Sequence, residues 1–148
     1  MRRLITLGAL AGALLQAGPA GAQSRNFCSG LLGAVNRVIE CPEGMEEIGG
    51  AAIGLICVGE AEPRPGAAAK PTPEQLEAQV QACLPSGWSV SDLRTAAIGG
   101  RPARFHEYLR RSDGLRMRVG ELIILRDTAR GRSAPVELRQ AFIAIPPK

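Results

Sequence analysis

Residues 103–126, ARFHEYLRRSDGLRMRVGELIILR, constrain the fold most, because two alternating apolar and polar runs flank a turn sequence. The pattern predicts two antiparallel strands joined at Ser112-Asp113-Gly114. A two-residue Asp113-Gly114 turn would mix apolar and polar side chains on both faces. A three-residue loop with its glycine in a left-handed bulge separates them, so we favour this register. It predicts that Leu109 lies opposite Met117.

The favoured register divides the hairpin into an apolar face and a polar face. The apolar face carries Phe105, Leu109, Leu115, Met117 and Val119. The polar face carries Arg104, His106, Tyr108, Arg110, Arg116 and Arg118. A sheet with one face on a core and the other in water has this division. The six polar residues therefore form a candidate binding surface.

Two features fit this register poorly. Glu107 and Glu121 fall on the apolar face, and Arg110 lies opposite Arg116 as a like-charge pair. An isolated strand glycine often marks a bulge, so Gly120 is expected to turn Glu121 outward. The arginine pair either splays into water or awaits an anion.

The N-terminus has the three parts of a secretory signal. Met1-Arg2-Arg3 is basic, residues 4–15 are mainly apolar, and Ala20-Gly21-Ala22 provides small residues for cleavage. We expect cleavage after Ala22, which leaves a single periplasmic or secreted domain, residues 23–148. The apolar run is too short to cross a bilayer, so no transmembrane segment is expected in the mature chain.

The cysteines are Cys28, Cys41, Cys57 and Cys83. An even number in an oxidising compartment predicts two disulfides. If residues 27–40 form one helix, Cys28 and Cys41 lie at its opposite ends, roughly 20 Å apart, and cannot pair. We favour Cys28 with Cys83 and Cys41 with Cys57, because antiparallel helices bring the start of one to the end of the other. The third connectivity remains open.

Further elements follow from turn and capping signals. Thr72-Pro73 opens a second helix that ends near Leu84. The other predicted segments are two short strands within residues 45–60, an exposed linker over residues 61–71, a strand over residues 88–93, a loop over residues 99–102, a basic turn over residues 128–134 and a strand over residues 135–145. This order predicts an α+β fold with two helices on one face of an antiparallel sheet of about 4–6 strands.

Charge is distributed unevenly along the chain. Residues 23–83 carry four basic and eight acidic residues, whereas residues 84–148 carry twelve basic and six acidic ones. A basic C-terminal half suits an acidic protein or another anionic envelope component as partner. Arginine-favouring codon usage is an alternative explanation. Export and few aromatic residues disfavour nucleic acid.

Motifs for catalysis, cofactors or metals are not found. His106 is the single histidine, and the sequence has neither C-x-x-C spacing nor a glycine-rich phosphate loop. We therefore expect no catalytic set, no cofactor and no metal. The favoured function is a non-enzymatic binding or interaction module. The alternative is a small periplasmic hydrolase that uses a serine, a glutamate or His106 in an unfamiliar site.

Overall fold

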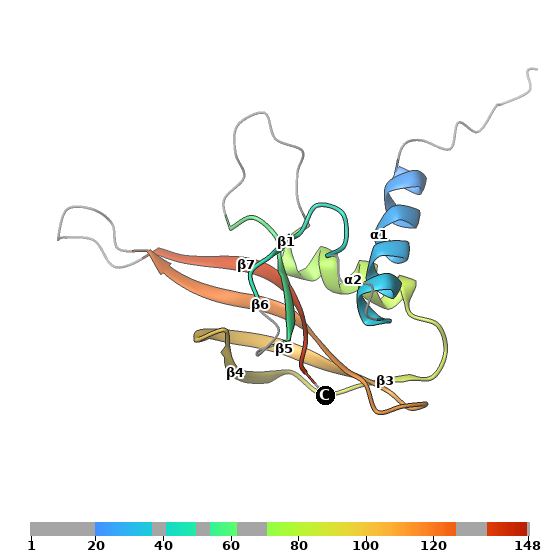
Figure 1. Cartoon of the computed structure of the whole chain (residues 1–148). Coiled ribbons are helices and arrows are strands. Elements are labelled where there is room, and N and C mark those ends of the chain that lie inside the picture. Colours follow the sequence, from blue (N-terminus) through green and yellow to red (C-terminus); the bar gives the residue numbers. More distant parts are fainter. Residues whose placement is uncertain (1–19, 37–40, 50–53, 62–70, 127–135, 148) are drawn as a thin grey trace, which may run out of the picture.

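The computed structural model describes residues 20–36, 41–49, 54–61, 71–126 and 136–147. Two helices, α1 (Ala20–Val35) and α2 (Pro73–Cys83), pack on one side of an antiparallel sheet (Figure 1). The strands are β1 (Glu46–Glu47), β2 (Leu55–Val58), β3 (Trp88–Val90), β4 (Arg94–Ile98), β5 (Arg101–Arg110), β6 (Arg116–Arg126) and β7 (Val136–Ile145). The α+β prediction is confirmed, but the sheet has seven strands, not four to six.

The sheet has the order β1-β2-β7-β6-β5-β3, and β4 also pairs with β5. The number of strands was underestimated because β4 was not predicted. The strand predicted over residues 88–93 is β3, which ends at Val90 and leaves room for β4 after it. Gly99 and Gly100 both have positive φ, 57° and 77°. The chain reverses within these two residues, so Ile98 pairs directly with Arg101. A two-residue turn of this kind joins adjacent strands of a hairpin. The loop predicted over residues 99–102 is therefore limited to Gly99 and Gly100, because Arg101 and Pro102 belong to β5.

The predicted register of the β5–β6 hairpin is wrong. Leu109 pairs with Arg116, and Tyr108 pairs with Met117. The turn spans residues 111–114, and the Arg110 N–H donates to the Leu115 carbonyl at 2.9 Å. Asp113 stabilises this longer turn, because its Oδ1 accepts from the Leu115 N–H at 3.2 Å and from Arg110 Nε at 2.8 Å.

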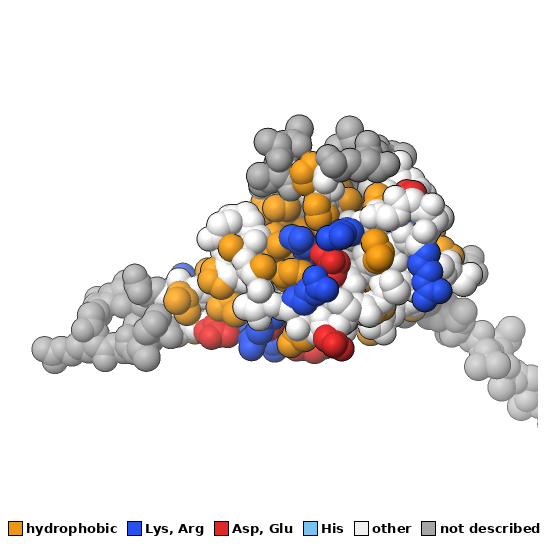
Figure 2. All heavy atoms as spheres, turned by 90° about the horizontal axis from the view of Figure 1, so that it is seen from below, with side chains coloured by type: hydrophobic (Ala, Val, Ile, Leu, Met, Phe, Trp, Pro, Cys, Tyr) orange, Lys and Arg blue, Asp and Glu red, His pale blue; other side chains and the backbone are white. Residues whose placement is uncertain are grey.

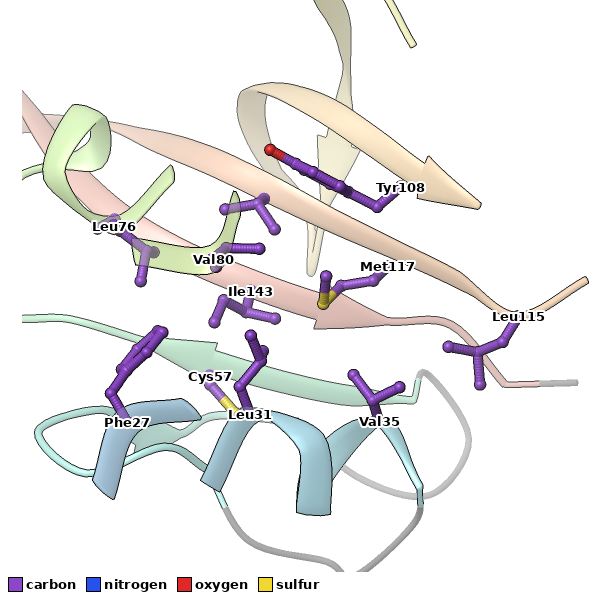
Figure 3. Packing of buried hydrophobic residues seen from close by; sticks show 12 residues of the cluster. Phe27, Leu31, Val35, Cys57, Leu76, Val80, Tyr108, Leu115, Met117 and Ile143 are labelled. Atoms are coloured by element: carbon purple, nitrogen blue, oxygen red, sulfur yellow. The ribbon is translucent and has the colours of Figure 1, made fainter. Parts of the chain in front are cut away.

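The register prediction failed because it assumed that one face of the sheet lies in water. Tyr108 and Phe105 point to opposite faces, and both are buried. The helix-side core includes Tyr108 and is shown in Figure 3. It comprises Phe27, Leu31, Val35, Cys57, Leu76, Val80, Tyr108, Leu115, Met117, Val119, Ala141 and Ile143.

A second core lies on the far face, which is the sheet face turned away from the helices. It comprises Ile56, Val58, Ile98, Ala103, Phe105, Leu122, Phe142 and Ala144. The sheet curls over these residues, since a Cβ at Gly99 in the β4–β5 tip would lie 3.7 Å from Ile56 Cδ1 in β2. Phe105 and Phe142 meet edge to face with their ring centroids 6.3 Å apart.

Helix α2 begins as its sequence indicates. The Thr72 hydroxyl accepts from the Gln75 N–H at 3.2 Å, and the Thr72 N–H donates to Gln75 Oε1 at 3.0 Å. This reciprocal pair is a capping box, and Pro73 occupies the first turn, where its missing N–H costs no hydrogen bond. Leu76 and Val80 are buried against the sheet.

Helix α1 ends at Val35, so Cys41 lies beyond the helix. The prediction had placed Cys41 at the end of it. The chain returns along the helix, because a Cβ at Gly30 would lie 3.0 Å from Pro42 Cα. Both disulfides nevertheless form as expected. Cys28 and Cys83 join the two helices with Cα atoms 5.1 Å apart, and Cys41 and Cys57 join the return segment to β2 at 5.6 Å.

Several predictions fall outside the described residues. They concern residues 1–19 of the expected signal, residues 37–40 of the first helix, residues 50–53 within the segment of two short strands, residues 62–70 of the linker and residues 127–135 around the basic turn. Within the described residues, neither helix is long and apolar enough to cross a membrane.

Candidate functional site

The six residues predicted as one polar face are divided between two faces of the sheet. Arg104, His106, Tyr108 and Arg110 lie on the helix side, whereas Arg116 and Arg118 lie on the far face. The four-residue turn causes this division, because a shift of one residue moves a strand's side chains across the sheet. Arg116 and Arg118 instead lie with Arg94 of β4, which was not among the predicted residues.

Arg94, Arg116 and Arg118 surround Glu107 on the far face, and we call this group the arginine cluster. Arg118 pairs directly with Glu107 across the strands, and its Nε lies 3.2 Å from Glu107 Oε2. Arg94 Nη1 lies 3.5 Å from Glu107 Oε1, and Arg116 Nη1 lies 3.9 Å from the same oxygen. Figure 2 shows the far face, with blue side chains gathered around a red one.

The members of the arginine cluster differ in exposure. The Glu107 side chain is only 10% exposed, and a buried carboxylate requires a charged or hydrogen-bonded partner. Arg118 meets this requirement and also lies 5.3 Å from the centroid of the Phe105 ring. Arg94 and Arg116 are 57% and 60% exposed. Three guanidinium groups around one carboxylate leave two positive charges in excess.

A small depression adjoins the arginine cluster. It has a volume of about 140 Å³ and lies where the β4–β5 tip approaches β2 and β7. Its lining residues are Ile56, Ala97, Ile98, Gly99, Arg118, Ala144 and Pro146. Arg118 therefore belongs both to the depression and to the arginine cluster.

A larger cleft, about 460 Å³, lies between α2 and the sheet on the helix side. Glu121 lines it and is 9% exposed, with its carboxylate held by Arg139 and by Arg104 Nε at 2.6 Å. Arg139 also binds Glu74, and this hydrogen bond is the largest of several effects that lower the Glu74 pKa. The arginines of the cleft are thus already paired with carboxylates.

The bulge predicted at Gly120 is absent, because β6 keeps one register with both neighbours through residues 118–122. Gly120 is instead a point of close approach, since a Cβ there would lie 2.1 Å from the Arg104 carbonyl oxygen. Glu121 therefore stays on the helix side and is neutralised there by arginine. Arginine pairing replaces the solvation that the outward position would have provided.

His106 lines the cleft beside Glu77. Its Nδ1 lies 2.9 Å from the Ser91 carbonyl oxygen, and its Nε2 lies 3.6 Å from Glu77 Oε1. The cleft lining contains no serine, threonine or cysteine among the described residues. The nearby Ser91 hydroxyl is engaged with the Asp92 carbonyl and the Glu107 N–H. The hydrolase hypothesis therefore has a histidine and carboxylates here, without a hydroxyl or thiol among the described lining residues, and it stays a prediction.

Tyr108 provides a pH-sensitive test of this side of the sheet. Burial raises its pKa above 10.0, the neighbouring Glu77 carboxylate raises it further, and a hydrogen bond from Gln81 opposes the shift. The folded state therefore keeps the phenol proton at a pH where the unfolded chain loses it. This contribution to stability is complete below pH 10 and declines as the pH rises through the folded pKa.

We expect the absorbance of tyrosinate to appear at higher pH in the folded protein than in the urea-unfolded chain. The chain has one tyrosine, so this signal reports Tyr108 alone. Glu77→Gln should move the folded midpoint part of the way down, because it removes a carboxylate that disfavours the phenolate. Equal midpoints in the folded and unfolded chains would contradict the buried position of this phenol.

The two surfaces differ in how their charges are satisfied. Glutamates pair the cleft arginines, whereas the arginine cluster has one carboxylate for three guanidinium groups.

The described residues contain no group of three or more histidine, cysteine, aspartate or glutamate side chains able to hold a metal ion. Comparisons with protein-family models, with curated proteins and with solved structures found no match.

Proposed function

We propose that this protein is a non-enzymatic binding module whose arginine cluster binds an anionic group on a partner protein. The observation that carries the proposal is the excess of two positive charges around Glu107, on the sheet face that the helices leave uncovered. Such a surface attracts and orients an acidic partner. Arginine suits this role, because its planar guanidinium group binds a carboxylate through two parallel hydrogen bonds.

The arrangement around Glu107 supports the proposal further. Glu107 is buried and fixed by Arg118, so it holds Arg94 and Arg116 near one point while both remain exposed. Fixing charged side chains before binding lowers the entropy lost when the partner arrives. A partner carboxylate placed between Arg94 and Arg116 would complete the pairing of the arginine cluster.

The proposed place of action is an oxidising compartment, the periplasm or the cell exterior. Two disulfides join the cysteines of the described residues, and such bonds persist in those compartments. The expected signal sequence agrees with this location. An acidic envelope protein is accordingly the partner that we propose.

Binding of a fluorescein-labelled peptide of glutamate and glycine tests the proposal. We expect fluorescence anisotropy to show binding at low salt that weakens as salt is added, because exposed charges are screened. Arg116→Gln should weaken binding about three- to fivefold, the usual effect of one exposed ion pair. Arg111→Gln is the matched control, since Arg111 is exposed in the β5–β6 turn and its loss changes the net charge equally.

The comparison of the two variants decides the outcome. If Arg111→Gln weakens binding as much as Arg116→Gln, the peptide senses only net charge and the arginine cluster is not a site. If wild-type protein does not bind the peptide at low salt, the proposal fails. Thermal unfolding of both variants checks that each remains folded.

A further inference from the structure

Strand β4 forms part of one edge of the sheet, and its outer side pairs with no strand among the described residues. Its first four residues, 94–97, are all exposed. Figure 1 shows β4 lying outside β5 on the side away from the helices. An exposed edge of this kind presents unpaired backbone groups to any extended chain that approaches it.

The outward backbone groups of β4 can be assigned from its register. Antiparallel pairs alternate between hydrogen-bonded and non-bonded, and a two-residue turn closes on a bonded pair, here Ile98 with Arg101. The bonded pairs therefore involve Arg94, Ala96 and Ile98. Pro102 lies opposite Ala97 and has no N–H, which agrees with a non-bonded pair. Thr95 and Ala97 consequently direct their N–H and C=O groups outward.

Little in β4 protects this edge from pairing. Natural edge strands are commonly blocked by lysine, proline or an inward-pointing charge. Residues 95–97 are threonine and two alanines, so neither charge nor bulk obstructs an approaching strand. Leu93 precedes them and is 60% exposed. The edge is therefore open at the strand that contributes Arg94 to the arginine cluster.

We infer that an extended acidic segment of the partner protein adds to β4 as a further strand. This inference rests on the proposed function, because the arginine cluster provides the charge that selects an acidic segment. Arg94 belongs both to β4 and to the arginine cluster. A carboxylate on the far face of the added strand is therefore attracted by the positive charges of the arginine cluster. Main-chain hydrogen bonds to Thr95 and Ala97 supply the remaining contacts.

The depression beside the arginine cluster provides a second place for a side chain of the added strand. Ala97, Ile98 and Gly99 line it, so it adjoins the end of β4 opposite Arg94. Its volume, about 140 Å³, accommodates one side chain about the size of valine. Side chains on one face of a strand recur at every second residue. The segment that fits best therefore combines a carboxylate near Arg94 with a side chain of this size near Gly99, both on the same face of the strand.

A second copy of the chain fits this edge less well. Pairing of β4 with β4 around a two-fold axis would continue the sheet and put both arginine clusters on the same face. Each cluster has two positive charges in excess, and like charges across paired strands are destabilising. Charge complementarity therefore selects an acidic partner over self-association.

Peptide binding to an edge variant tests the inference. The probe is a labelled peptide with the repeat Glu-Thr-Val-Thr, which places glutamate and valine on the same face of the added strand. Thr95→Pro removes an outward N–H without removing a β4–β5 hydrogen bond, and proline is tolerated on the solvent side of an edge strand. We expect it to weaken binding by about tenfold or more, because the added strand loses its alignment. Thr95→Val retains the N–H and should change the affinity less than about twofold.

Amide hydrogen exchange on the unaltered protein provides a second measurement, which does not depend on the folding of a variant. Saturation with the peptide should slow exchange at the Thr95 and Ala97 N–H groups by about tenfold or more, because both become hydrogen-bonded. Unchanged exchange at both positions, with the peptide bound, would overturn strand addition.

The outcomes separate this inference from the proposed function. If Arg116→Gln weakens binding but Thr95→Pro and the exchange rates show no effect, the arginine cluster is a site and strand addition is wrong. If neither the glutamate–glycine peptide nor the glutamate–valine peptide binds, both proposals fail. Concentration-dependent dimerisation that slows amide exchange at Thr95 and Ala97 would identify a second copy as the occupant. Binding to anionic lipid vesicles, with neither peptide bound, would identify a membrane. Either result contradicts the inference.

Discussion

Replacement of Gly120 by alanine is expected to prevent normal folding or to lower the free energy of unfolding by on the order of 3 kcal/mol or more. The added Cβ would lie 2.1 Å from the Arg104 carbonyl oxygen and 2.6 Å from Phe105 Cα. Both atoms belong to the backbone of β5, so a side-chain rotation cannot relieve the clash. The β5–β6 pair would have to separate at the centre of the sheet.

Gly59→Ala provides the matched control for this prediction. A Cβ at Gly59 would lie 3.7 Å from Ala141 Cβ, which is an ordinary van der Waals distance. We expect a change below about 0.5 kcal/mol for this variant. Urea unfolding followed by Trp88 fluorescence measures both variants, since the chain has one tryptophan. A Gly120→Ala protein as stable as Gly59→Ala would show that β5 and β6 do not approach this closely.

Removal of the Cys28–Cys83 disulfide is expected to cost more stability than removal of the Cys41–Cys57 disulfide. The first spans 55 residues of sequence and the second 16. Chain-entropy estimates at these separations are about 4 and about 3 kcal/mol. Single domains have a total stability of only about 5–15 kcal/mol, so either loss is a large fraction. The longer bridge also joins α1 to α2, and α1 contributes Phe27, Leu31 and Val35 to the helix-side core.

Two double variants test this ordering, Cys28→Ala with Cys83→Ala and Cys41→Ala with Cys57→Ala. Each removes both partners and leaves no free thiol from the pair to exchange with the other bridge. Urea unfolding gives the two losses under the same conditions. A larger loss from the Cys41 and Cys57 variant would mean that structure retained in the unfolded chain, and not loop length, controls the stabilisation.

Signals that act over a few residues predicted their structures well. Thr72, Pro73 and Gln75 begin α2 through contacts within one turn, and these contacts form in any tertiary setting that leaves the segment helical. The favoured disulfide pairing is confirmed, although one premise behind it was wrong and one other connectivity had stayed open. Cys41 lies beyond the end of α1, yet Cys28 still meets Cys83, because the two helices bring those residues together.

The hairpin register was not predictable by sorting apolar from polar residues. That criterion holds for a sheet with one solvated face, whereas this sheet buries Tyr108 on one side and Phe105 on the other. Asp113 favours the longer turn by accepting from the Leu115 N–H, but the same residue would also suit the two shorter turns. The choice among the three turns depends on which side chains the distant strands cover.

The arginine cluster shows the same limit at the level of function. Arg116 and Arg118 were among the predicted binding residues, but Arg94 was not, because β4 was not predicted. The Gly99-Gly100 pair was the available signal, since a two-residue turn there places Arg94 opposite Phe105. On the apolar face of the predicted register Glu107 fits poorly, whereas in the folded chain it is the carboxylate that holds three arginines together.

The amino-acid sequence alone was sufficient for the α+β class and for the start of α2, because caps and turn residues depend on local chemistry. It also favoured the disulfide pairing that forms, while one other connectivity stayed open. The tertiary structure alone decided the register, the seventh strand and the composition of the arginine cluster. These features depend on contacts between segments far apart in the sequence, such as the approach of Gly99 in the β4–β5 tip to Ile56 of β2. A contact between residues so distant in sequence leaves no periodic pattern in either segment, so it becomes visible only when the chain is folded.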